Sequence, residues 1–400
     1  MKQASNNTGV VRYARIAVAC AAFATLVACG GGSDNNNNNN ASATPAGGVK
    51  LQVVSFGDSL SDVGTYSPVI TSSFGGGRYT TNPGEVWTQK IAEYYGDTLT
   101  PAYVGGFGQP LKANGGFGYA QGGSDVSRTD GIGFAPNNMA QTTWPVTQQV
   151  QQYLTDHGSF NSNQLVLVNG GANDILQNLS TMLTTIQTQV AQLTDPTQAP
   201  AVVQSVAVST VGPMAQALAA QIATILAKGA THVVVMDVPD IGKTPFAAGL
   251  AAQLGSAQVP SVISGIVATY NGVLQQSLAV AGISSKVVFI ATGNWLTPLL
   301  ANPSAQGFSN TTGTACTIAQ MSANATAYAK ANPSVLVGGI TAEQYGQLFG
   351  SSLFCSPNTL TVAGADQSYV FADTIHPTTH AHAAFATFVE GKIAATGLGK

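Results

Sequence analysis

The chain has 400 residues, of which 44% are apolar and only 8% are charged, and its formal net charge is -3. This length is sufficient for one large domain with a sizeable core. The few charges form no basic stripe, which argues against nucleic acid as a partner, and the exterior must consist largely of Gly, Ser, Thr, Asn and Gln.

The N-terminus has the pattern of an export signal. Three basic residues lie among the first 15, no acidic residue precedes Asp34, and the apolar stretch 16–27 is too short to span a bilayer as a stable helix. The stretch ends in Leu-Val-Ala-Cys-Gly, which resembles a bacterial lipobox, where the signal is cleaved on the N-terminal side of a cysteine and that cysteine is acylated. We expect a lipoprotein signal peptide over 1–28 and lipid attachment at Cys29; the alternative is an ordinary secretory signal cleaved elsewhere.

A flexible tether is predicted over residues 29–49. The segment combines glycines, six consecutive asparagines at 35–40 and a short Ala/Ser/Thr/Pro run, so it cannot bury enough apolar surface to order itself. A lipid anchor followed by such a tether would hold a soluble domain near a membrane. The pattern therefore predicts an exported protein, first as an outer-membrane lipoprotein and otherwise as a secreted or periplasmic protein, with its folded domain over 50–400.

Apolar strand-like segments alternate with helical segments after the tether. The expected strands are 51–56, 165–169, 231–237 and 286–291, and the expected helices are 85–95, 175–195, 200–228, 261–281 and 377–395. Apolar β-branched runs separated by helices are typical of a parallel sheet covered on both faces, so the expected fold class is α/β with three layers, α/β/α. We place Pro377 at the start of the last helix, where its missing N–H does no harm.

Chemistry in such a fold lies in loops at the carboxyl ends of the strands. Ser59 and Asn173 both follow predicted strands, which favours a site at that edge. The regions 63–84, 100–145 and 296–365 are weakly regular and rich in Gly, Asn and Pro, and we expect them to be long loops that form lids or rims.

Four short blocks contain the residue types needed for acyl transfer. In chain order they are Gly-Asp-Ser-Leu-Ser at 57–61, Gly-Tyr-Ala-Gln-Gly-Gly-Ser at 118–124, Gly-Gly-Ala-Asn-Asp at 170–174 and Asp-Thr-Ile-His-Pro at 373–377. A serine hydroxyl is a poor nucleophile until a neighbouring imidazole takes its proton, and an aspartate can orient that imidazole. Ser59, His376 and Asp373 can supply these groups. No Gly-x-Ser-x-Gly elbow occurs, which argues against the α/β-hydrolase version of this chemistry.

Each block is weak alone, but together and in this order they resemble the GDSL, or SGNH, hydrolase family. The likeness covers roughly residues 50–395, and Gly118 departs from it because the family's second block often has asparagine there. The segment 78–87 is similar to the family's segment after the nucleophile, and 237–245 is similar to its middle strand exit. The segments 302–316 and 369–382 are similar to the branch of bacterial outer-membrane and secreted lipase/esterases. The resemblance implies the family's flavodoxin-like three-layer fold.

The resemblance also assigns roles to residues. It implies Ser59 as nucleophile and His376 as base with Asp373 behind it. The oxyanion donors would be the backbone N–H groups of Ser59 and Gly123 and the side-chain amide of Asn173.

The activity that follows is hydrolysis of a carboxylic ester, of a small molecule or a lipid, through an acyl-enzyme intermediate and with no cofactor. Polysaccharide deacetylation and phospholipase or lipid acyltransferase activity at the same site stay open as alternatives. A further alternative is a surface-anchored binding module that has lost activity. The sequence does not predict the oligomeric state.

Four cysteines occur in the chain. Cys20 would leave with the signal and Cys29 would carry lipid, so Cys316 and Cys355 remain as an even pair in an oxidising compartment, which favours a disulfide over two buried thiols. The segment between them is polar and rich in Gly, Ser and Asn, and we expect it to have little core of its own.

Several polar and aromatic residues have simpler explanations than catalysis. His376 and His380 have a zinc-like spacing, but the metalloprotease glutamate is absent and Pro377 breaks the first turn, so we expect no metal and a surface or packing role for His380 and His382. Carboxylates such as Asp58 and Asp174 are more often cap or turn partners. The loop aromatics that either line an acyl pocket or belong to the core are Tyr66, Phe74, Tyr79, Phe107, Phe117 and Tyr119.

Overall fold

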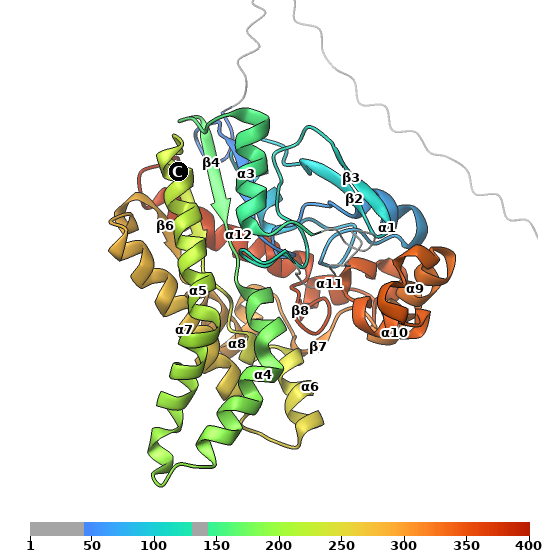
Figure 1. Ribbon diagram of the computed structural model, residues 1–400. Helices are drawn as coiled ribbons and strands as arrows, with labels where there is room; N and C mark the ends of the chain where they lie inside the picture. The colour runs from blue at the N-terminus through green and yellow to red at the C-terminus, as the bar shows by residue number, and fades with distance from the viewer. Residues whose placement is uncertain (1–43, 130–142) are drawn as a thin grey trace, which may run out of the picture. The chain divides into compact units, whose positions relative to one another are not determined.

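The computed structural model describes residues 44–129 and 143–400 (Figure 1). The predicted signal peptide, the lipid-attachment residue Cys29 and most of the predicted tether lie outside the described residues. The last part of that tether, 44–49, does not follow the prediction, because it packs on the domain. Gly47 N–H donates to Tyr94 O at 2.8 Å, and the Gly47 carbonyl accepts from Lys400 N–H at 3.1 Å.

A parallel sheet of four strands lies at the centre of the domain. Its order is β1 (Gln52–Phe56), β4 (Gln164–Val168), β5 (His232–Met236) and β6 (Val288–Ile290). These are the four predicted strands, with ends that differ from the prediction by at most two residues. All five residues of β4 are buried, as expected for a central strand that is covered on both faces.

Alternate strand residues face two different helical layers. Val166 and Val168 belong to a core cluster with α3 (Val146–His157), α4 (Ala172–Val190), α5 (Ala199–Ala227) and α7 (Val259–Val280). Leu165 and Leu167 pack with α2 (Trp87–Tyr94) and α12 (Thr379–Ala394) on the other face. Figure 1 shows α5 in front of the sheet and α12 behind it, which confirms the three-layer α/β/α fold.

Helix α5 belongs to the segment 196–227, which is long and apolar enough to cross a membrane by length and composition. In the structure its residues Val211, Leu218 and Ile222 are buried in the cluster with α4 and α7. Core helices commonly share the length and composition of membrane spans. This segment is therefore a core helix of the domain.

The last helix begins two residues later than predicted. Pro377 does not occupy its first turn but forms a bridge with Phe371. Thr378 is the N-cap, and its hydroxyl accepts from Ala381 N–H at 3.2 Å. A threonine cap supplies a hydrogen bond that proline at the first helical position does not, so the cap determines where the helix starts.

The regions predicted as long loops contain regular elements. They are α1 (Ser67–Phe74), the antiparallel hairpin of β2 (Tyr103–Gly106) and β3 (Gln109–Ala113), most of α8 (Gly293–Ala301), β7 (Asn310–Thr314), α9 (Ile318–Ala331) and α10 (Ala342–Phe349). Helix α11 (Ala365–Ser368) and strand β8 (Tyr369–Phe371) come at and after the end of the third region. Helix α6 (Pro245–Leu254) follows β5. The loop prediction for 296–365 was therefore wrong in its central part.

The segment closed by Cys316 and Cys355 has a core of its own. The predicted disulfide is present, with Cα atoms 5.8 Å apart. Between the cysteines, Met321, Tyr328 and Tyr345 are buried in one cluster with α1, so the expectation of little core was wrong. Alanine, serine and asparagine separate the large side chains in this segment, and they masked the helical spacing of those side chains in the sequence. In the structure these short residues allow α9 and α10 to pack closely.

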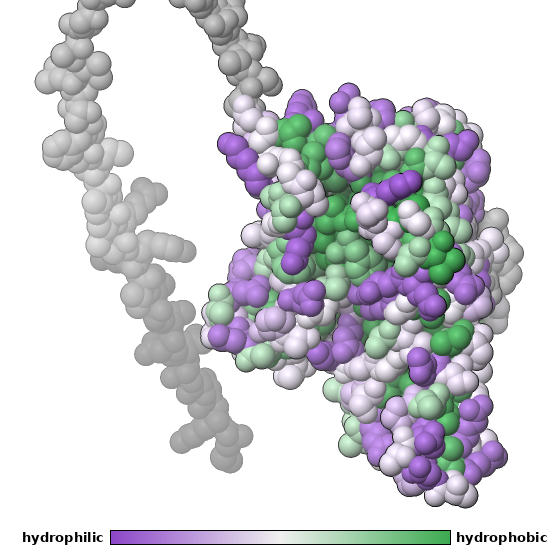
Figure 2. Space-filling view, turned by 90° about the vertical axis from the view of Figure 1, so that its left-hand side faces the viewer, coloured by the Kyte–Doolittle hydropathy of each residue, from purple (hydrophilic) through white to green (hydrophobic). Residues whose placement is uncertain are grey.

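The exterior has few charges, as the composition requires. Figure 2 shows one face on which hydrophilic residues are mixed with residues of near-neutral hydropathy, around an apolar area in the upper part. Strand β6 is one of the two edge strands of the sheet, and its residues Val288 and Phe289 are half-buried.

Candidate active site

The four sequence blocks meet at the carboxyl edge of the sheet. Ser59 lies in the turn after β1, and Asn173 lies in the first turn of α4, directly after β4. Because β1 and β4 are hydrogen-bonded neighbours, these two chain segments emerge side by side. Gly123 lies in the loop before α3, and His376 lies between β8 and α12.

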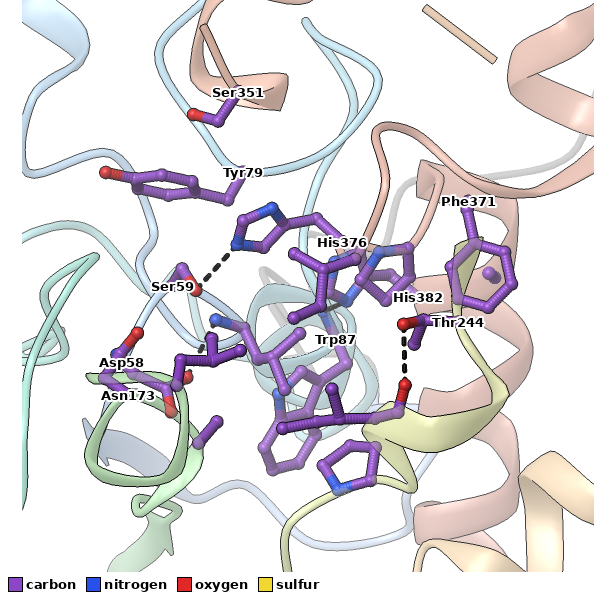
Figure 3. A pocket seen from close by; sticks show the side chains of 18 of the residues that line it. Asp58, Ser59, Tyr79, Trp87, Asn173, Thr244, Ser351, Phe371, His376 and His382 are labelled. Atoms are coloured by element: carbon purple, nitrogen blue, oxygen red, sulfur yellow. Dashed lines mark hydrogen bonds between the residues drawn. The ribbon is translucent and has the colours of Figure 1, made fainter. Parts of the chain in front are cut away.

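Ser59, His376 and Asp373 form one continuous hydrogen-bonded chain. His376 Nε2 lies 2.9 Å from Ser59 Oγ, although the two residues are 317 positions apart in the sequence. His376 Nδ1 lies 2.7 Å from Asp373 Oδ2. Figure 3 shows the Ser59 and His376 side chains pointing toward each other. This geometry allows the imidazole to take the serine proton while its other nitrogen stays bonded to the carboxylate.

The Asp373 carboxylate is buried, and each of its oxygens accepts two hydrogen bonds. Its Oδ1 accepts from the backbone N–H groups of Ile375 and His376, each at 2.8 Å, and its Oδ2 also accepts from Ser352 N–H at 2.6 Å. Burial alone would raise the pKa of Asp373, but the adjacent His376 ring and these hydrogen bonds outweigh it and hold the pKa well below its usual range. The group is therefore a carboxylate that can hold the ring in one tautomer.

The three residues that the sequence predicts as oxyanion donors lie around the same cavity. Ser59, Gly123 and Asn173 all line it. Gly123 has φ 86°, in the left-handed region that favours glycine. The Asn173 side-chain amide donates to Ser124 O at 2.8 Å, which fixes the orientation of the amide and leaves its second N–H. The structure thus brings together Ser59, Gly123 and Asn173, as the sequence predicts.

The preceding glycine of the second block is needed for packing. A Cβ at Gly122 would lie 2.1 Å from the ring of Tyr79, which no real contact allows. The Tyr79 ring in turn packs on His376, with ring centroids 5.1 Å apart. A side chain at Gly122 would therefore displace the aromatic ring that packs on the imidazole.

A buried polar chain supports the turn that carries Ser59. Asp58 Oδ1 accepts from Leu60 N–H at 3.0 Å and from the Asn169 amide at 2.8 Å. Asn169 Oδ1 accepts from Ser61 Oγ at 2.6 Å, and Trp87 Nε1–H donates to Ser61 Oγ at 3.2 Å. Asp58 is thus a turn partner, as predicted, and burial raises its pKa.

Asp174 has a longer-range contact than the predicted cap or turn role. Its Oδ2 accepts from Val126 N–H at 3.0 Å, which ties the first turn of α4 to the segment that follows Gly123. Its Oδ1 is buried without a hydrogen-bond partner among the described residues. Burial raises the pKa of Asp174 to about 6.

An apolar cavity of about 250 Å³ opens beside Ser59. Of the six loop aromatics considered above, Tyr79 and Phe107 line it and also belong to a core cluster, and the other four lie in or against the core clusters without lining it. Most of the lining comes from helices and from strand exits. Lining residues that sequence reasoning missed include Leu176, Ile241, Leu296, Leu348, Ala381 and Phe385. Their only signal is apolar character on a helix or at a strand exit, which a core residue has as well.

The other two histidines near the site have packing contacts. His382 is buried, and its Nδ1 accepts from Trp87 N–H at 3.2 Å. Burial lowers the pKa of His382 to about 3, so its ring is neutral at physiological pH. His380 stacks on Phe308 with ring centroids 4.4 Å apart. Among residues 44–129 and 143–400, no group of three or more His, Cys, Asp or Glu side chains could hold a metal ion.

Comparison with known families agrees with this geometry. The model of the family described as GDSL-like Lipase/Acylhydrolase matches residues 53–389, which includes all four blocks. No curated protein matches the chain. The chain therefore belongs to the GDSL-like lipase/acylhydrolase family, a family of hydrolases that act on ester bonds.

Proposed function

We propose that the protein is a serine carboxylic ester hydrolase that works through an acyl-enzyme intermediate on Ser59. The observation that carries the proposal is the unbroken chain from Ser59 Oγ through His376 to Asp373, with contacts of 2.9 and 2.7 Å, at the wall of an apolar cavity. The complete set of acyl-transfer groups argues against an inactive binding module.

In the first half-reaction, Ser59 Oγ attacks the ester carbonyl carbon while His376 Nε2 takes the hydroxyl proton. The carbonyl oxygen becomes an oxyanion that accepts hydrogen bonds from the N–H groups of Ser59, Gly123 and Asn173. Loss of one such donor typically costs about 3–4 kcal/mol of transition-state stabilisation. His376 then gives the proton to the leaving alkoxide, so the alcohol departs and the acyl group stays on Ser59.

In the second half-reaction, His376 takes a proton from water, and the resulting hydroxide attacks the acyl carbonyl. The same donors stabilise the second oxyanion. Its collapse breaks the bond to Ser59 Oγ, which regains its proton from His376, and the carboxylic acid leaves. Asp373 stabilises the imidazolium in both halves, because its carboxylate is already bonded to Nδ1.

The cavity favours an ester of an aliphatic acid over an acetylated glycan. An acetyl group fills little space, and a sugar needs polar partners, whereas this cavity is mostly lined by apolar side chains. A dry protein cavity of roughly 150 Å³ holds a benzene molecule of six carbons. On that scale about 250 Å³ corresponds to an acyl chain of roughly ten carbons. Phospholipase or acyltransferase activity would use the same cavity and differ in the group that leaves or accepts.

The decisive test compares wild type with Ser59→Ala. Wild type should hydrolyse p-nitrophenyl esters and should be labelled on Ser59 by a fluorophosphonate probe. Ser59→Ala should lose both properties while its thermal unfolding stays unchanged. Turnover that persists in the variant would refute the nucleophile assignment, and a wild type that is not labelled would favour the binding module. A panel from acetate to palmitate, with a phospholipid and an acetylated glycan, then identifies the substrate class.

We also propose export as an outer-membrane lipoprotein that is acylated at Cys29. The support is sequence alone: a short apolar stretch, a lipobox-like end and a Gly/Asn-rich tether. Cys29→Ser should abolish metabolic labelling with a fatty acid and shift the protein from the membrane to the soluble fraction. Unchanged fractionation of this variant would contradict the proposal.

A further inference from the structure

Gln149 lies outside the four blocks, yet its side chain contacts two of them. It is in the first turn of α3 and is completely buried. Its Oε1 accepts from Gly57 N–H at 2.9 Å, and its Nε2 donates to Gly57 O at 2.8 Å. The glutamine amide thus pairs with both backbone groups of Gly57, as a residue of a neighbouring strand would.

This pairing occurs just beyond the end of strand β1, where the chain has left the hydrogen-bond ladder of the sheet. Strand β1 ends at Phe56, and Gly57 has φ 152°. A Cβ at Gly57 would lie 2.0 Å from Asn169 Oδ1, so no side chain fits there. Gly57 O has a second donor in Gln121 N–H at 3.1 Å, whereas Gln149 is the acceptor for Gly57 N–H. Without the glutamine, this buried N–H would lose its acceptor.

The same amide also reaches the loop that carries Gly123. Gln149 Nε2 donates to Ser124 Oγ at 2.9 Å and to Trp144 O at 3.0 Å, so its two protons serve three acceptors. Ser124 Oγ donates to Trp144 O at 2.7 Å, and Ser124 O accepts from the Asn173 amide at 2.8 Å. Gln149 is therefore connected to the chain segments of all three proposed oxyanion donors.

We propose that Gln149 is a positioning residue that sets the distance between the nucleophile turn and the oxyanion donors. The inference rests on the proposed function. Gly57 is two residues from Ser59, and Ser124 is next to Gly123, so a shift at the amide reaches both donors through very short chain segments. A misplacement of about 1 Å at a reacting centre can lower the rate by about 10²-fold.

The test is kinetic and uses the full-length protein. Gln149→Leu removes the amide at similar size, Ser124→Ala removes one of its contacts, and Gln148→Leu is the matched control at the exposed neighbour. Active sites are titrated with the fluorophosphonate, and kcat is expressed per titrated site. We expect Gln149→Leu to lower kcat per site and the labelling rate by roughly 10- to 100-fold with KM nearly unchanged. Ser124→Ala should lower kcat per site and the labelling rate by a smaller factor, and Gln148→Leu should have the wild-type values of both.

A purely structural role has a different signature. It would lower the number of titratable sites and the unfolding temperature, while kcat per titrated site stayed at the wild-type value, and this result overturns the inference. If Gln149→Leu does not fold, Ser124→Ala decides in the same way. A wild type that is not labelled at Ser59 would instead reject the proposed function, so the two failures are distinguishable.

Discussion

Ser352 N–H and His376 Nδ1 contact the same carboxylate oxygen, Asp373 Oδ2, at 2.6 and 2.7 Å. Ser352 lies three residues before Cys355, and its carbonyl accepts from the Asn82 amide at 3.1 Å. The disulfide-closed segment therefore supplies a hydrogen bond to the carboxylate behind the proposed base. The segment 296–365, which the sequence predicts to be a lid or rim loop, thus contributes a hydrogen bond to the candidate active site.

Asp373→Asn tests the carboxylate itself. The amide is nearly the same size, but it carries no charge to stabilise the imidazolium and can present N–H to the ring, which favours the wrong tautomer. We expect kcat to fall by roughly 10³- to 10⁴-fold with little change in KM. Steady-state kinetics on a soluble short-chain ester measure this loss. A decrease of less than tenfold would mean that Asp373 does not act on the ring.

Removal of the disulfide should affect both stability and activity. A cross-link between residues 39 positions apart contributes about 4 kcal/mol in the chain-entropy model. A Cys316→Ser, Cys355→Ser double variant should therefore unfold at a lower temperature. Below that temperature, its kcat should also fall, because the turn that holds Ser352 against Asp373 is less constrained. An unchanged kcat would show that the turn keeps its position without the cross-link.

The pH dependence of stability should reveal Asp174. Burial raises its pKa from 3.8 to about 6, so the folded state holds this proton more tightly than the unfolded state does. The resulting stabilisation is complete below pH about 3.8 and is lost as the pH rises through about 6. Asp174→Asn does not titrate, and its amide oxygen can still accept from Val126 N–H. The free energy of unfolding of the variant relative to wild type should therefore increase between pH 4 and pH 7.5, by on the order of 2 kcal/mol.

Chemical denaturation at both pH values measures that difference. The pH dependence that His382 contributes has the opposite sign, because folding lowers its pKa from 6.5 to about 3. Its contribution to the free energy of unfolding is therefore lost as the pH falls from 6.5 toward 3. This loss is common to wild type and Asp174→Asn, and the difference between the two proteins isolates the carboxyl group. An identical pH dependence in both would show that Asp174 is ionised without cost.

The acyl-chain length should depend on Ala381. This residue is buried on α12 and lines the cavity, whereas Ala383 on the same helix does not line it. Ala381→Leu adds three carbons to the wall and should shift the preferred ester to a shorter chain. Ala383→Leu is the matched control and should keep the wild-type profile. Equal profiles of kcat/KM against chain length for the two variants would place the acyl group elsewhere.

The sequence determined the sheet and the identity of the candidate site. Runs such as Leu165–Val168 are short, apolar at every position and rich in β-branched residues, which is the pattern that a strand buried on both faces requires. Ser59, Asn173 and His376 were recognisable because each lies in a short block with its neighbours. Local sequence is informative there, since the chemistry requires specific residue types next to glycines or next to each other.

The tertiary structure alone decided what surrounds those groups. Gln149 is one of several glutamines on α3, and Ser352 contributes only a backbone N–H, so neither has a residue-type signal of its own. Likewise, Ala381 and Phe385 look like ordinary core residues until the chain folds and leaves a cavity beside them. Hydrogen-bond partners and empty space depend on segments that are tens to hundreds of residues apart, and the sequence does not record the distances between such segments.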